Sequence, residues 1–122
     1  MTEFRLSILT PDREWFAGPA ESVTAPGQAG EFGVLANHMP MIAGLKPGAV
    51  QVRAVGGKTS WFAVDGGVLG VDRNGVRILT GRVVACPTPE NARTAVAVFV
   101  REAEPRNSAK QNQAAESRAP IS

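Results

Sequence analysis

Most of the chain consists of short stretches in which apolar and polar residues alternate, as they do in strands that turn one face to a core. Near the start, Phe4, Leu6 and Ile8 fall on one side of such a strand. Residues 49–55 alternate in the same way, which places Val50 and its alternate neighbours on the inner face. The pattern predicts strands that are buried on one side.

Glycine and proline separate these stretches. Thirteen glycines and nine prolines recur at intervals of roughly eight to twelve residues, a spacing typical of an all-β sandwich. Gly56-Gly57 and Asn74-Gly75 suit the tight turns of β hairpins. Further breaks are expected at Gly18-Pro19, at residues 46–48 and at residues 65–67. We therefore predict a mainly β fold with a C-terminal α segment, in which residues 1–86 form a two-sheet β sandwich of about ten strands.

After Cys86 the apolar residues follow a different spacing. Thr88 suits the cap of a helix that begins at Pro89, since proline is tolerated at the first helical position. The apolar residues that follow recur at helical spacing: Ala92, Ala95, Val96, Phe99 and Ala103. We predict one helix within residues 87–105, ended by Pro105, although the valines at alternate positions also fit a strand. The polar tail, residues 106–122, holds too few apolar residues to offset the entropy of ordering, so we expect it to be frayed or disordered.

Composition and charge narrow the possible partners. The net charge is +2, and basic residues outnumber acidic ones by only one in residues 1–86 and by one in residues 87–122. No part of the chain is a basic tail, so we expect no nucleic-acid partner. The single cysteine excludes an internal disulfide, and we expect Cys86 to be a small buried residue. No apolar run is long enough to span a membrane and no signal-peptide layout begins the chain, which predicts a cytoplasmic protein.

The candidate functional stretch is residues 30–42, which combine two glycines, one carboxylate (Glu31), the only histidine (His38) and a proline with several apolar residues. It has no hydroxyl nucleophile and no second histidine, so neither a catalytic triad nor a metal site is expected. Asn37 tolerates the left-handed conformation that a tight turn needs. A rigid loop at the edge of a sandwich is instead suited to docking on another protein.

The order of motifs resembles the epsilon subunit family of the rotary F-type ATP synthase, over residues 4–104. The resemblance rests on several pieces at family-like spacing, of which none is specific alone: Leu9-Thr10-Pro11, Phe16-Ala17-Gly18, Gly30-Glu31-Phe32-Gly33-Val34-Leu35, His38-Met39-Pro40, Leu45-Lys46-Pro47-Gly48, and Phe62-Ala63-Val64-Asp65-Gly66-Gly67-Val68-Leu69. It implies a ten-stranded sandwich in a non-catalytic subunit of the central stalk, at the cytoplasmic face of the bacterial membrane. The membrane would be reached only through the complex.

The resemblance also implies partners and contact residues. Glu31 and Phe32 match the segment that faces the c-ring, and Asn37, His38, Met39, Pro40 and Met41 match the segment that meets the gamma subunit. The family's usual Pro-Gly-His-Ala-Pro is here Ala36-Asn37-His38-Met39-Pro40, so the larger Met39 changes the detail of the gamma contact.

The C-terminal region departs further from the family. Some members bind ATP through an Ile-Asp-x-x-Arg-Ala pattern, and here the aligned stretch keeps Arg93, places Glu90 for the aspartate and replaces the isoleucine by Pro89. We therefore expect no bound cofactor. With a proline at position 105 and a weak tail, inhibition of ATP hydrolysis by an extended C-terminus should be weak or absent.

Two other functions fit parts of the sequence. A freestanding β-sandwich module for a peptide or sugar would need an exposed aromatic groove, and the chain has only seven aromatic residues. A small hydrolase would need His38 within hydrogen-bond reach of Asp65 or Glu31. Asp65-Gly66-Gly67 lacks the lysine and the helix of a phosphate-binding loop, so a bulge or tight turn is expected there.

Overall fold

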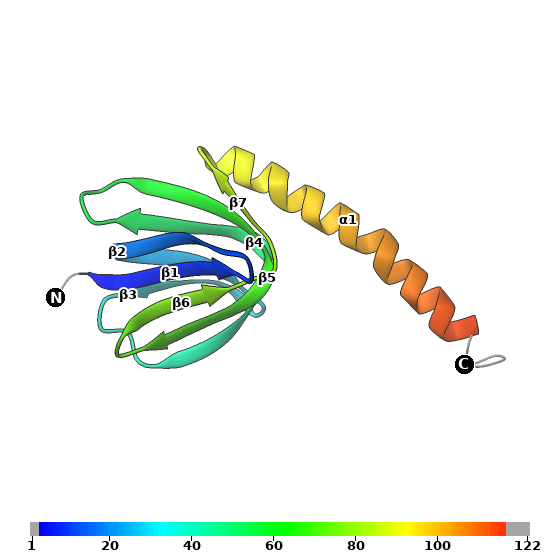
Figure 1. Ribbon diagram of the computed structural model, residues 1–122, viewed down its shortest axis with the longest axis horizontal. Coiled ribbons are helices and arrows are strands. Elements are labelled where there is room, and N and C mark those ends of the chain that lie inside the picture. Colours follow the sequence, from blue (N-terminus) through cyan, green and yellow to red (C-terminus); the bar gives the residue numbers. More distant parts are fainter. Residues whose placement is uncertain (1–2, 117–122) are drawn as a thin grey trace.

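The computed structural model describes residues 3–116, with side chains for residues 3–102. It contains seven strands and one helix: β1 (Phe4–Thr10), β2 (Arg13–Gly27), β3 (Gly30–Leu35), β4 (Met41–Ala54), β5 (Thr59–Asp72), β6 (Gly75–Leu79), β7 (Val83–Cys86) and α1 (Pro89–Glu116). The strands form one body and the helix begins beside β7 and runs obliquely away from it (Figure 1). The predicted order of a β domain followed by a helix is confirmed.

The sheet closes on itself. Its strand order is β1-β6-β5-β4-β2-β3, and an additional pairing joins β1 to β2. All the neighbouring strands are antiparallel except β1 and β6, which run parallel with Leu6 opposite Val76. The contact continues past β6, where the Thr80 amide donates to the Leu9 carbonyl at 3.0 Å. Closure leaves few unpaired edges, which suits a small rigid domain.

The core fills the inside of this ring. Leu6 and Ile8 are fully buried and Phe4 packs beside them, as the alternation predicts. Val50 and Val52 are likewise fully buried. Each buried apolar side chain of this size contributes about 1.5–3 kcal/mol to stability. The aromatic pair in the core meets edge to face, with the Phe16 and Phe62 ring centroids 6.1 Å apart.

Seven strands replace the ten expected, because three of the predicted breaks lie inside long strands. Gly18-Pro19 lies within β2, residues 46–48 within β4 and residues 65–67 within β5. In each case the turn-forming residues bend a strand instead of ending it. A 15-residue strand such as β2 therefore pairs with β1, β3 and β4 in turn, with register shifts against β4.

The bend at residues 65–67 is where β5 changes its partner. The first part of β5 pairs with β7 as far as Val64, and the second part pairs with β6 from Val68 onward. Gly66 and Gly67 take φ values of 79° and 127°, which favour glycine. The predicted role of this stretch as a bulge or tight turn is thus close to the observed one, although the strand continues through it.

Helix α1 begins as predicted and ends later than predicted. The Asn91 amide donates to the Thr88 hydroxyl at 3.1 Å, which is the expected cap. The apolar face of the helix packs on the outside of the sheet through a second cluster around Ala63, Cys86, Ala92 and Phe99, so Cys86 is buried as expected. The helix then continues through position 105 to Glu116. The expected end at Pro105 is wrong, and residues 106–116 of the tail expected to be disordered are helical. Residues 117–122 lie outside the described part of the chain.

Candidate functional site: the two ends of β3

The residues expected to meet other proteins lie at opposite ends of β3. This strand pairs with β2 in an antiparallel register in which Glu31 is opposite Pro26 and Leu35 is opposite Ser22. Leu35 is four positions after Glu31, a distance of about 13 Å along a strand. The strand therefore presents one candidate surface at each end.

At the first end, glycines position Phe32. Gly27 leaves room for its ring, because a Cβ atom at that position would lie 2.8 Å from the Phe32 ring carbons. Gly30 has a φ of 138°, which makes the tight turn after Gln28 possible. Phe32 is thereby half-buried against the core while Glu31 is exposed beside it. At this end, a fixed backbone therefore presents the Glu31 carboxylate to a partner protein.

At the second end, a short turn follows Leu35. Asn37 has a φ of 65°, which confirms the left-handed conformation expected for it. The His38 amide donates to the Leu35 carbonyl at 3.3 Å, and His38 Nδ1 lies 2.7 Å from the Met39 carbonyl oxygen, so this nitrogen carries the proton. These bonds within the turn hold its shape and leave the side chain of Met39 outside.

Three large apolar side chains at this end are exposed to solvent. The exposed fraction is 65% for Leu35, 76% for Met39 and 84% for Ile42. Leu35 and Met39 flank the turn, whereas Ile42 follows on β4 and lines a separate hollow with Met41, Val68 and Leu79. Large apolar side chains exposed in one short segment (35 to 42) indicate a protein-interaction surface.

Met41 is placed differently from the rest of its predicted group. It is half-buried against the core and lines a hollow together with Gly30, Glu31 and Phe32. The structure therefore brings Met41 to the first end, next to the residues expected to meet the c-ring. Asn37, His38 and Pro40 line a different hollow at the second end.

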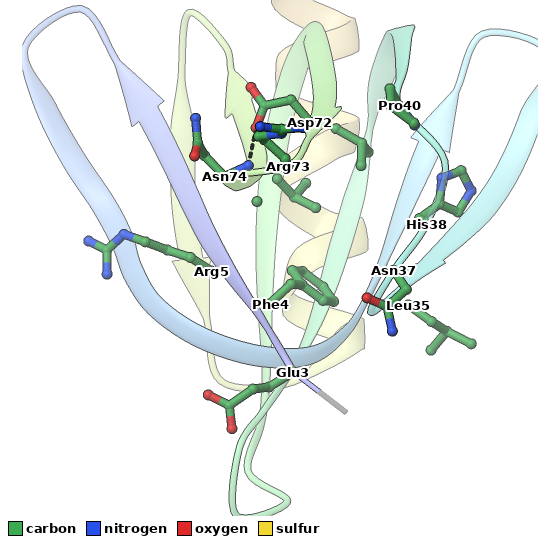
Figure 2. A pocket seen from close by; sticks show the side chains of 13 residues that line it. Glu3, Phe4, Arg5, Leu35, Asn37, His38, Pro40, Asp72, Arg73 and Asn74 are labelled. Atoms are coloured by element: carbon green, nitrogen blue, oxygen red, sulfur yellow. Dashed lines mark hydrogen bonds between the residues drawn. The ribbon is translucent and has the colours of Figure 1, made fainter. Parts of the chain in front are cut away.

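This second hollow is an open groove of about 570 Å³ between the turn after β3, the start of β1 and the β5–β6 turn. Figure 2 shows His38 and Pro40 on one side of it, with Asp72 and Asn74 across from them. Its charged side chains are of both signs, Glu3 and Asp72 against Arg5 and Arg73. A mixed lining of this kind does not concentrate an anion, but it suits contacts with a protein surface.

The geometry gives no support to catalysis at these residues. The His38 ring bonds to the Met39 carbonyl, and Arg82 donates to the Asp65 carboxylate. Within residues 3–102 no hydrogen bond joins His38 to Asp65 or Glu31. In the same residues no three metal-binding side chains gather. The aromatic groove of a sugar- or peptide-binding module is not seen, because each of the seven aromatic side chains is buried or half-buried. No helix in the described residues is long and apolar enough to cross a membrane.

Two exposed apolar residues of this surface, Leu35 and Ile42, were not among the predicted contacts. A signal for Ile42 exists, since alternation along β4 places it on the face opposite Met41. Leu35 could be recognised in the same way from its alternation with the buried Val34. The hydrogen bond from Arg82 to Asp65 could not be predicted from the local sequence pattern, because the two residues are 17 positions apart.

Comparison with known proteins agrees with this architecture. Residues 3–85 match the family described as "ATP synthase, Delta/Epsilon chain, beta-sandwich domain". Similar proteins include the "ATP synthase epsilon chain, chloroplastic" of Chlamydomonas reinhardtii, with 41% identity over 98 residues that cover 75% of this chain and 70% of that protein. Another is the "ATP synthase epsilon chain" of Caulobacter vibrioides, with 40% identity over 84 residues that cover 69% of this chain and 96% of that protein.

A solved structure shares the fold. A chain of the Euglena gracilis mitochondrial ATP synthase, in a structure of OSCP, F1 and the c-ring, superposes with a TM-score of 0.68 at 28% identity, covering 84% of this chain and 66% of that one. The family match, residues 3–85, includes strands β1 to β6, both ends of β3 and all of β7 except its last residue. The chain belongs to the delta/epsilon chain family of the ATP synthase.

Proposed function

We propose that this chain is the non-catalytic epsilon subunit of the central stalk of a proton-translocating F-type ATP synthase, where it couples rotation of the c-ring to the gamma subunit and so to ATP synthesis. Family membership supports the assignment, as does the likeness to a chain from a structure that contains F1 and the c-ring. The closed ring of strands supplies the stiffness that transmission of torque requires.

The single observation that carries the proposal is the exposure of Leu35 and Met39 at a turn held by its own hydrogen bonds, with the exposed Ile42 following on β4. A rigid turn that displays apolar side chains loses little conformational entropy on binding. We assign this end of β3, with Asn37, His38, Met39 and Pro40, to the gamma subunit.

We assign the other end of β3 to the c-ring, through Glu31 and Phe32. Glu31 is exposed on a backbone fixed by Gly27 and Gly30, which suits a polar contact that must hold its position under load. Met41 lines the hollow beside these residues, so its predicted gamma contact would bring the gamma subunit next to the c-ring end of β3 as well.

The proposal also covers where the subunit lies in the cell and whether its C-terminal region inhibits ATP hydrolysis. The subunit would sit on the cytoplasmic face of the bacterial membrane and reach it only through the complex. Inhibition of ATP hydrolysis by the C-terminal region is proposed to be weak or absent.

Co-purification with a tagged gamma subunit tests the assignment. The full chain should be retained with gamma at a one-to-one ratio after a wash at physiological salt. If the untagged chain is lost from gamma, or instead acts alone on a small substrate, the proposal fails.

A further inference from the structure

Met39 is the most exposed sulfur-containing side chain in the part of the chain whose side chains are described. The sequence has three methionines and one cysteine, and Met1 lies outside the described residues. The exposed fraction of Met39 is 76%, whereas Met41 is half-buried against the core and Cys86 is buried beneath the helix. An oxidant in solution therefore reaches the Met39 thioether before the sulfur atoms of Met41 and Cys86.

The main chain around Met39 is held in place. The His38 amide donates to the Leu35 carbonyl at 3.3 Å, and the His38 ring donates from Nδ1 to the Met39 carbonyl at 2.7 Å. Pro40 then fixes its own backbone angle. His38 and Pro40 line the groove of Figure 2, and Met39, between them in the sequence, does not. The turn thus presents the Met39 side chain to solvent from a fixed backbone.

Oxidation of this thioether would change the chemistry of an apolar surface. Leu35, on the other side of the turn, is 65% exposed, and together the two side chains form the apolar part of the surface that we assign to the gamma subunit. A sulfoxide replaces a flexible apolar group by a polar one whose oxygen is a strong hydrogen-bond acceptor. Burial of that oxygen against an apolar partner surface, without a donor, costs free energy. The sulfoxide therefore opposes docking.

We propose that Met39 is an oxidation site, and that its conversion to the sulfoxide in the free chain prevents the turn from docking on the gamma subunit. The oxidant is hydrogen peroxide. The lone pair of the Met39 sulfur attacks one peroxide oxygen and forms the S–O bond as the O–O bond breaks. The other oxygen leaves as water with the proton of the transferred oxygen, so the sulfur loses two electrons and the peroxide gains them. The identity of the partner in this inference rests on the proposed function.

The modification is reversible. Methionine sulfoxide reductases return the sulfoxide to the thioether, while a dithiol is oxidised to a disulfide and the oxygen leaves as water. The site is open only before assembly, because a docked gamma subunit would cover Met39. A chain that meets peroxide before assembly is therefore kept from the gamma subunit until its Met39 is reduced.

The first measurement needs no partner. The full chain is treated with hydrogen peroxide for increasing times, and peptide mapping follows the mass gain of one oxygen at each methionine. Met39 should be oxidised at least about fivefold faster than Met41, because the half-buried side chain must first become exposed by a local opening of the structure.

The second measurement compares binding to the isolated gamma subunit before and after peroxide, so that each variant is its own reference. For the wild type and for Met41→Leu, oxidation should raise the dissociation constant about fivefold to tenfold. For Met39→Leu, the dissociation constant after peroxide should stay within about twofold of its value before, because leucine keeps an apolar side chain of similar size without a sulfur atom. Treatment of the oxidised wild type with the reductases and a dithiol should restore binding.

Two results would overturn the inference. It fails if Met39 is oxidised no faster than Met41, and it fails if Met39→Leu loses affinity on oxidation as much as the wild type does. A wild type that binds gamma equally well before and after complete oxidation of Met39 overturns this inference alone. A wild type that does not bind gamma even before peroxide overturns the proposed function, and the docking effect with it.

Discussion

Gly67 on β5 lies directly against the main chain of Leu79 at the end of β6, in the space where any other residue would carry its Cβ atom. A methyl group there would overlap the Leu79 carbonyl oxygen and crowd the Thr80 Cα atom at 3.1 Å. The φ of 127° at Gly67 adds a second reason for glycine. This close approach allows β5 to change its partner from β7 to β6.

Replacing Gly67 by alanine should destabilise the domain by about 3 kcal/mol, because backbone atoms on β6 must move and a strained φ must be kept. Urea unfolding measures the change. Gly70→Ala is the control on the same strand, since a Cβ atom there meets nothing within 4 Å. It should change stability by less than about 0.5 kcal/mol. Equal effects of the two substitutions would show that the approach at Gly67 is not needed.

The β1–β2 turn predicts a dependence of stability on pH. The Thr10 hydroxyl donates to Asp12 Oδ1 at 2.6 Å, and this bond, with a further backbone bond, lowers the pKa of the Asp12 carboxyl below 3.8. A lowered pKa in the folded state contributes stability that is present above the unfolded value and is lost as the pH falls through the folded value. Asp12→Asn should therefore unfold more easily than the wild type at neutral pH, and the gap in urea midpoint should close well below pH 3.8. If the urea midpoints of Asp12→Asn and the wild type still differ in acid, the prediction is contradicted.

Truncation after Ala103 tests the proposal on inhibition. The shortened chain keeps the Thr88 cap, the buried Ala92 and Phe99, and the Arg82–Glu102 pair, so it should fold and assemble. ATP hydrolysis by the assembled motor should then differ by less than about twofold between the full and shortened chains. A large rise in hydrolysis on truncation would mean that the removed segment inhibits the motor.

Glu31→Lys tests the c-ring contact. Glu31 is exposed, so reversal of its charge should leave stability nearly unchanged while it places a cation where the proposed partner accommodates a carboxylate. We expect proton-driven ATP synthesis by the reconstituted motor to fall severalfold. Glu14→Lys, at an exposed position near the start of β2, is the control and should have little effect. If both variants behave alike, Glu31 has no special place in coupling.

Local features of the fold were predictable from the sequence, and long-range ones were not. Alternation identified the buried Leu6 and Ile8, and Asn74-Gly75 marked a hairpin in which Asp72 pairs with Gly75. Such signals need only neighbours in the sequence. Turn residues were misread as strand ends at residues 46–48 and elsewhere, because whether a strand bends or stops depends on which partners lie on either side of it.

In the candidate site too, local features were predictable from the sequence and long-range contacts were not. The left-handed Asn37 followed from the chemistry of one residue, and the structure confirms it. The placement of Met41 beside Phe32 did not follow, because it depends on how β4 pairs with β2, the neighbour of β3. Arg82 bonds to the carboxylates of Asp65 and Glu102, which are 17 and 20 positions away from it in the sequence. No periodic pattern predicts pairs so far apart.

Direct titration of this chain with the isolated gamma subunit is the most direct test of the central claim. The wild type should bind at one to one, and Met39→Glu should weaken binding at least about tenfold, because a charge would be buried among apolar contacts. Val55→Glu alters an apolar residue that is 44% exposed near the Gly56-Gly57 turn, and it should bind within about twofold of the wild type. The account is contradicted if the wild type does not bind gamma, or if the two variants bind equally.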